Sequence, residues 1–185
     1  MATTESQSLL TAEQYALLPD SGLPTELVRG KIVEMNRPFP RHGQVCGEAY
    51  YILKSFVKLH DLGHVLSNDF GVITERSPDS VRGPDVAFFS YARVPRGRLP
   101  NWYLDVPPEV VIEVRSPSDR WVTLTAKATE YLDAGVAVVC LLDPDNDSIH
   151  VMRAEQPTVK LGPDDELTLP EMHPSFRVPV RQFFE

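Results

Sequence analysis

Two long stretches of the chain repeat their apolar residues at helical spacing, and short apolar runs lie around them. Residues 44–59 have this spacing, which predicts an amphipathic helix that Gly63 ends. Residues 124–135 predict a second helix, with capping side chains at residues 116–119. Runs rich in Val, Ile and Phe favour pleated structure. They predict strands at residues 65–67, 71–74, 85–89, 110–114 and 136–142.

A short helix and a hairpin are predicted before the first long helix. Thr11 is a capping residue whose partner is Gln14, and Pro19 ends this helix. Arg29-Gly30 separates two short apolar runs, and glycine permits the positive φ of a tight hairpin turn. The sequence therefore predicts a β-hairpin over residues 26–34.

The remaining elements complete one α/β domain. The second long helix lies between two strands and resembles a crossover connection. An aspartate-rich turn at residues 143–147 leads back into a strand, and short apolar pieces within residues 155–185 predict edge strands. We expect a single domain over residues 1–185, with a mixed, bent sheet flanked by helices and a core over about residues 11–152.

The composition is that of an ordinary folded domain. Of the 185 residues, 42% are hydrophobic and 24% charged, which argues against disordered and fibrous classes. No apolar run approaches the roughly 20 residues that span a bilayer, and the polar first residues lack the features of a signal peptide. We therefore expect a cytoplasmic protein without a membrane segment. Cys46 and Cys140 have no CxxC spacing, so we expect two buried thiols.

The net charge of −8 argues against a protein that coats nucleic acid without specificity, because such binding depends on Lys and Arg neutralising phosphates. An enzyme that acts on DNA is still compatible, since local positive charge can coexist with overall acidity. Four arginines flank the strand predicted at residues 85–89; they are Arg82, Arg93, Arg96 and Arg98. They are either solvated surface residues or contacts to phosphate.

Two carboxylates lie in apolar, strand-like segments. Asp85 opens one such run and Glu113 lies inside another. A buried ionised carboxylate is costly without a partner, so a metal ion or a lysine is expected nearby. Lys127 is a candidate, because it shares a helical ridge with Leu124 and Tyr131. Two acids and a lysine suit phosphodiester hydrolysis, in which carboxylates hold Mg²⁺ and its waters and the lysine orients a water or stabilises charge on phosphate.

Each of these residues also has a structural interpretation. Asp85 is compatible with a turn acid after proline, and Lys127 with an outward helix lysine. Glu113 is compatible with a structural ion pair to Arg115 or Lys127. A nuclease fold without activity would carry much the same pattern.

Other motifs are excluded. The aspartate-rich turn begins like a calcium loop, but Ser148 replaces its glycine. Gly63 interrupts any helix that would align His60 and His64 as metal ligands. The sequence has no P-loop, G-x-S-x-G or G-x-G-x-x-G motif.

Several segments, taken in order, resemble a known family. Pro84-Asp85 and Glu113 resemble the PD-(D/E)XK nuclease superfamily, and further pieces are similar to its Uma-type restriction endonuclease family. These pieces are Glu26 to Ile32, Pro40-Arg41-His42-Gly43, Gly83 to Ala87, Glu113 to Asp119, and Lys127 through Tyr131 to Val136. The resemblance implies a restriction-endonuclease-like fold with an αβββαβ core and covers roughly residues 11–152.

The resemblance implies that Asp85 and Glu113 bind Mg²⁺ or Mn²⁺ and that DNA is the substrate. The superfamily's E-x-K pattern would place lysine at position 115, where this chain has Arg115, a poor base at ordinary pH. We therefore assign the lysine role to Lys127. Glu26 and His42 match family positions near the site and are supporting candidates, and Arg115 joins the candidate DNA contacts.

The sequence thus predicts a metal-dependent DNA endonuclease. The alternative is a non-catalytic DNA- or protein-binding module that keeps the fold, such as a defence or mobile-element accessory protein. We also expect a homodimer, because a two-fold axis presents two sites to the two strands of a duplex. Apolar residues near the C-terminus offer one possible contact surface; they are Phe176, Val178, Val180, Phe183 and Phe184.

Overall fold

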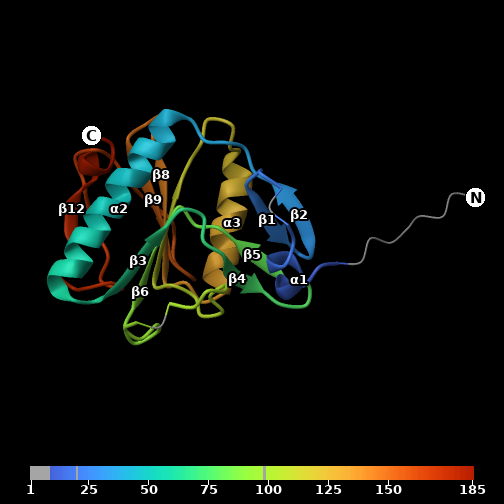
Figure 1. The fold of residues 1–185 in the computed structure, drawn as a ribbon. Helices are drawn as coiled ribbons and strands as arrows, with labels where there is room; N and C mark the ends of the chain where they lie inside the picture. Colours follow the sequence, from blue (N-terminus) through green and yellow to red (C-terminus); the bar gives the residue numbers. More distant parts are fainter. Residues whose placement is uncertain (1–8, 20, 98) are drawn as a thin grey trace, which may run out of the picture.

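The computed structural model describes residues 9–19, 21–97 and 99–185, and its largest unit is a mixed six-stranded sheet (Figure 1). The strands are β3 (Gly63–Ser67), β6 (Val86–Ser90), β7 (Val110–Val114), β8 (Val138–Asp143), β9 (Ser148–Met152) and β10 (Val159–Leu161). Their order across the sheet is β10-β9-β8-β7-β6-β3. Only β7 and β8 run parallel; the other neighbours are antiparallel.

Two helices cover opposite faces of this sheet (Figure 1). On one face, α2 (Pro40–His60) buries Val45, Ala49, Leu53 and Val57. On the other, α3 (Trp121–Asp133) forms the predicted crossover between β7 and β8. Val110 and Ile112 of β7 pack into the apolar cluster beneath α2, and Val111 packs into the cluster beneath α3. A strand covered on both faces is apolar on both faces, which explains why β7 does not alternate apolar and polar residues.

The two long helices begin and end differently from expectation. α2 begins at Pro40, since proline suits the first helical position, and ends at Asp61 in the left-handed conformation at φ 57°. Gly63 therefore does not end this helix. A Cβ there would lie 2.0 Å from the Phe89 carbonyl oxygen, so glycine permits β3 to approach β6. α3 begins after Arg120 without a side-chain cap.

No helix in the described ranges combines the length and the apolarity needed to cross a membrane.

A second sheet was not predicted. The hairpin strands β1 (Thr25–Val28) and β2 (Lys31–Glu34) form as expected. They continue into β5 (Ser80–Arg82) and β4 (Val72–Glu75) in the order β2-β1-β5-β4, and α1 (Ala12–Ala16) packs against this sheet. The strand predicted at residues 71–74 thus forms as β4, but it belongs to this second sheet and not to the six-stranded one. β5 is only three residues long within a polar segment, so no apolar run marked it.

The C-terminal segment supplies β10 as an edge strand of the six-stranded sheet, as expected, and its last part then returns to the core. β11 (Glu166–Thr168) and β12 (Arg177–Pro179) pair only with each other, and the 3₁₀ helix η1 (Val180–Phe183) follows. Phe176 and Phe183 are at most 1% exposed and belong to the cluster beneath α2. The proposed dimer surface is therefore wrong for these residues, because their side chains are already buried within the chain.

We expect Phe176→Ala to lower the free energy of unfolding by about 3–5 kcal/mol, because it opens a cavity where Phe176 packs edge-to-face on Phe56 at 5.1 Å. Chemical denaturation followed by circular dichroism measures this. Leu59→Ala is the control, since Leu59 is 79% exposed and its loss should change stability by no more than about 0.5 kcal/mol. Equal effects of the two substitutions would contradict the packing of the C-terminal segment.

Candidate active site

Asp85 and Glu113 lie at neighbouring ends of two adjacent strands, Asp85 directly before β6 and Glu113 within β7. β6 and β7 are antiparallel with Val86 opposite Ile112, so the next position in this register places Asp85 opposite Glu113. Residues that are directly opposite in an antiparallel pair project from the same face. Asp85 Oδ2 also accepts a hydrogen bond of 2.7 Å from the backbone N–H of Val114, which holds this carboxylate at the end of β7.

Two side chains of α3 hold Glu113, which is only 5% exposed. Lys127 Nζ lies 2.9 Å from Oε1 and donates to Oε2 at 3.0 Å. The Tyr131 hydroxyl donates to Oε1 at 2.9 Å. Lys127 and Tyr131 are four positions apart and so lie on one side of the helix. Lys127 therefore points into the protein, as its place on the apolar ridge predicts.

The hairpin sheet brings a third carboxylate to the same lysine. Glu26 on β1 is buried, and its Oε1 lies 2.9 Å from Lys127 Nζ. The backbone N–H of Gly83 donates to Oε1 at 3.0 Å, and Arg82 Nη1 donates to Oε2 at 2.8 Å. Lys127 thus lies between Glu26 of one sheet and Glu113 of the other.

Arg82 extends this network to the outer side of α3. Its Nε donates to Glu130 Oε1 at 2.9 Å, and the Thr74 hydroxyl donates to the same oxygen. The Arg82 side chain is 14% exposed and contacts carboxylates on two sides. Its contribution to DNA binding stays a prediction.

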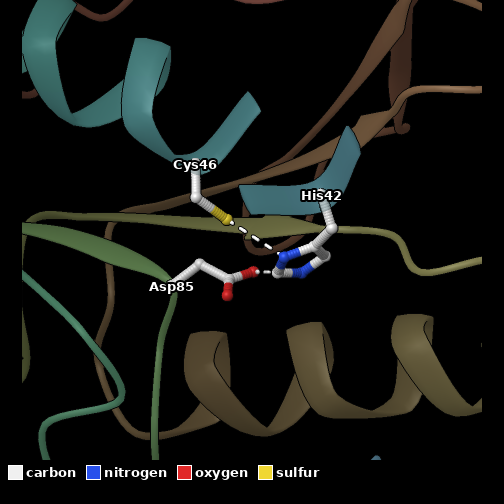
Figure 2. Close-up of side chains that lie close together, drawn as sticks. All are labelled: His42, Cys46 and Asp85. Atoms are coloured by element: carbon white, nitrogen blue, oxygen red, sulfur yellow. Dashed lines mark hydrogen bonds and ion pairs between the residues drawn. The ribbon is translucent and has the colours of Figure 1, made fainter. Parts of the chain in front are cut away.

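The first turns of α2 place a histidine and a thiol beside Asp85 (Figure 2). His42 Nε2 lies 3.5 Å from Asp85 Oδ2, and Cys46 Sγ lies 3.4 Å from His42 Nδ1. The two helix residues are four positions apart, so both project toward the sheet. Together with Asp69, they line a cavity of about 290 Å³.

Burial and charge shift several pKa values in the site. Burial raises the pKa of Glu113 to about 8; Asp85 and Glu26 reinforce this shift, and Lys127 opposes it. Burial alone would lower the pKa of Lys127, but Glu113 and Glu26 raise it above its ordinary value. The lysine therefore stays an ammonium at neutral pH, while Glu113 binds a proton more strongly than an ordinary carboxylate.

The neighbouring groups respond to the same charges. Although burial would lower the pKa of His42, its contact with Asp85 raises that pKa overall. Burial raises the pKa of Asp69, and Asp85 adds to the shift. Burial also raises the pKa of the Tyr131 hydroxyl, which therefore stays protonated and donates a hydrogen bond to Glu113.

The donor set fits a hard divalent cation. Carboxylate oxygens are the protein ligands that Mg²⁺ and Mn²⁺ prefer, and Asp85 and Glu113 offer them from opposite positions. Glu26 and Asp69 lie near them, together with the cationic side chains of Arg82 and Lys127 and the imidazole of His42, whose pKa is raised. A divalent cation would favour the ionised form of Glu113 and so oppose the effect of burial on its pKa.

The loop arginines differ in how firmly the fold holds them. Arg93 Nε lies 3.1 Å from Glu109, and its Nη1 donates to the Pro108 carbonyl at 3.1 Å. Arg96 is more exposed; it pairs with Asp61 and its guanidinium lies 4.2 Å from the Tyr91 ring centre. Arg98 lies outside the described residues.

The Arg115 side chain contacts two aspartates instead of Glu113. Its Nη1 donates to Asp143 at 3.1 Å and to Asp145 at 2.7 Å, in the turn after β8. Its guanidinium also lies 5.4 Å from the Trp121 ring centre. The aspartate-rich turn thus binds an arginine, and Lys127 is the cation in contact with Glu113.

Several residues of the site were not identified from the sequence. Tyr131 was assigned only to the apolar face of its helix, although its spacing of four from Lys127 could have indicated a shared partner. Glu130 and Asp69 carried no motif. Cys46 was expected to be a buried thiol, but it is only half-buried and lies beside His42.

The fold is that of the restriction-endonuclease-like nucleases. The chain matches a crystal structure described as a "putative nuclease belonging to DUF820" from Anabaena variabilis ATCC 29413, with a TM-score of 0.82 and 24% sequence identity. The match covers 95% of this chain and 97% of the other. The profile of the Uma2 family, described as "Putative restriction endonuclease", matches residues 12–181, and the chain belongs to this family. The comparison with curated proteins finds no match.

We expect the affinity for Mn²⁺ to rise with pH up to about 8. Below its pKa of about 8 Glu113 is protonated, and it must lose that proton before it can coordinate a cation. The affinity should therefore rise by up to about tenfold per pH unit below this value and level off above it. Calorimetric titration with Mn²⁺ at several pH values measures this. Glu113→Gln should weaken Mn²⁺ binding and flatten this rise, and a constant wild-type affinity from about pH 6 to about pH 9 would contradict the raised pKa.

Proposed function

We propose that this protein is a Mg²⁺- or Mn²⁺-dependent endonuclease that hydrolyses phosphodiester bonds of DNA. The observation that carries the proposal is the contact of 2.9 Å between Lys127 Nζ and Glu113 Oε1, with Asp85 opposite Glu113 on the neighbouring strand. Two carboxylates and one ammonium converge there from two strands and a helix. The description of the family supports DNA cleavage as the reaction.

Each residue of the site has a role in this proposal. Asp85 and Glu113 hold the divalent cation, which would lower the pKa of a bound water so that it can act as the nucleophile. Lys127 orients the attacking water or stabilises charge that develops on the phosphate. Glu26 and Tyr131 are positioning residues, because they contact Lys127 and Glu113 instead of the substrate.

Among the candidate DNA contacts, the loop arginine Arg96 fits best. Its side chain is 61% exposed and its ion pair with Asp61 is also exposed, so phosphate can replace that partner at small cost. Arg93 is tied to Glu109 and to backbone carbonyls and fits a structural role better. Local positive charge from such a loop would allow an acidic protein to bind DNA.

One observation favours the alternative of a non-catalytic binding module. Lys127 already satisfies Glu26 and Glu113, so this ion pair could stabilise the fold without any metal. Mn²⁺ binding distinguishes the two functions, because a nuclease site must coordinate the cation through Asp85 and Glu113. A structural ion pair has no such requirement.

We expect wild-type protein to cleave plasmid DNA with Mg²⁺ or Mn²⁺ and to be inactive in chelator. Asp85→Asn should abolish both cleavage and Mn²⁺ binding. Lys127→Met, which keeps the length of the side chain without its charge, should reduce turnover about a hundredfold or more while retaining Mn²⁺ binding, since one lost electrostatic donor costs about 3–4 kcal/mol of transition-state stabilisation. Thermal unfolding checks that each variant is folded.

Arg115→Ala is the rival test for this assignment. A literal E-x-K pattern would make Arg115 the catalytic cation, whereas its contacts to Asp143 and Asp145 indicate a structural role. We expect Arg115→Ala to keep most of the turnover. Full activity in Lys127→Met together with an inactive Arg115→Ala would reverse the assignment, and wild-type cleavage in chelator would exclude the metal-dependent mechanism.

Homodimerisation is part of the proposal, because one site per chain cuts both strands most simply when a two-fold axis relates two sites. The surface involved must lie outside the buried C-terminal residues Phe176 and Phe183. We expect light scattering to give the mass of two chains at micromolar concentration in the presence of DNA. A mass of one chain, with and without DNA, would exclude the dimer.

A further inference from the structure

The group formed by His42, Cys46 and Asp85 differs chemically from the pair that would hold Mg²⁺. Each of the three side chains offers one ligand atom, and these three atoms lie within 4.8 Å of one another (Figure 2). Mg²⁺ takes oxygen ligands, whereas imidazole and thiolate favour Zn²⁺ and similar ions. The cysteine and the histidine therefore favour Zn²⁺ at this position, whereas the carboxylates of Asp85 and Glu113 favour Mg²⁺.

The spacing of Cys46 Sγ and His42 Nδ1 fits zinc coordination. With Zn–S of roughly 2.3 Å and Zn–N of roughly 2.0 Å, tetrahedral angles place sulfur and nitrogen roughly 3.6 Å apart. Cys46 Sγ and His42 Nδ1 are 3.4 Å apart. Both residues lie near the start of α2, so the helix backbone sets their spacing. Asp85 Oδ2 lies 3.5 Å from the other ring nitrogen, Nε2, so the imidazole and the carboxylate must reorient for all three side chains to share one ion.

The position is also accessible. His42, Cys46 and Asp85 line the cavity of about 290 Å³, which Asp69 lines as well. An ion can therefore enter, and a water can supply the fourth ligand, as in zinc sites with three protein ligands. Cys140, the other cysteine, is fully buried in β8 and lies in no such group among the described residues.

We propose that His42, Cys46 and Asp85 form a site for a thiophilic divalent cation such as Zn²⁺, and that this site shares Asp85 with the Mg²⁺ position. On binding, the thiol of Cys46 releases its proton to solvent and the thiolate bonds to the ion. Because Asp85 then coordinates Zn²⁺, it is withdrawn from the pair with Glu113. Zn²⁺ thus inhibits the nuclease. The inhibition rests on the proposed function, whereas the binding does not.

Co²⁺ and Zn²⁺ alone are the probes for binding. Co²⁺ titrated into wild-type protein should produce the charge-transfer absorption of a thiolate ligand, which Zn²⁺ should abolish by displacement. Cys46→Ala should lose this absorption and weaken Zn²⁺ binding by roughly a hundredfold, since loss of even an outer-shell partner costs 10–100-fold. Cys140→Ala is the matched control and should behave as wild type. Thiolate absorption that persists in Cys46→Ala, or no such absorption in wild type, would overturn the site.

Cleavage assays test the shared carboxylate. With Mg²⁺ present, micromolar Zn²⁺ should inhibit wild type and Cys140→Ala, but not Cys46→Ala, with each protein compared with its own zinc-free rate. Equal inhibition of Cys46→Ala would show that Zn²⁺ acts elsewhere, and it would overturn the proposal that Zn²⁺ at this site inhibits cleavage. If no protein cleaves DNA, the proposed nuclease function fails, and the Co²⁺ spectra still decide whether the thiolate site exists.

Discussion

The ammonium of Lys127 is the interaction on which the site depends. It lies 2.9 Å from Glu26 on the hairpin sheet and 2.9 Å from Glu113 on the central sheet. Removal of one partner from a buried ion pair leaves an uncompensated charge, which is far more costly than the loss of an exposed pair. This one side chain therefore joins α3 to both sheets and holds the carboxylates close together in spite of their repulsion.

The electrostatics of the site follow from this arrangement. One lysine compensates two buried carboxylates, and Arg82 supplies the second cation to Glu26. Glu26 consequently has a lowered pKa in spite of its burial, whereas the pKa of Glu113 is raised. Burial is the largest influence on the pKa of both acids; at Glu113 it prevails with the help of Asp85, whereas at Glu26 the two cations Lys127 and Arg82 outweigh it.

Much of this could be predicted from the sequence, because the central strands and long helices are strongly patterned. Apolar runs identified β6, β7 and β8, and helical spacing identified α2 and α3. The embedded acids Asp85 and Glu113, and Lys127 on an apolar ridge, were recognisable for the same reason. The short strand β5 and the partition of the strands into two sheets were not predictable, since they depend on pairing between distant segments. The contacts of Glu130, Asp69 and Cys46 likewise arise only from tertiary structure.

The position of Arg115 has a consequence for how such sites diversify. Because the cation beside Glu113 comes from α3, the position two residues after Glu113 is free to serve another purpose, and here it anchors the turn after β8 through Asp143 and Asp145. A linear motif that requires glutamate and lysine two positions apart would pass over this chain. In this chain the contact between ammonium and carboxylate is spatial, made by a helix one crossover away and not by the strand that carries the carboxylate.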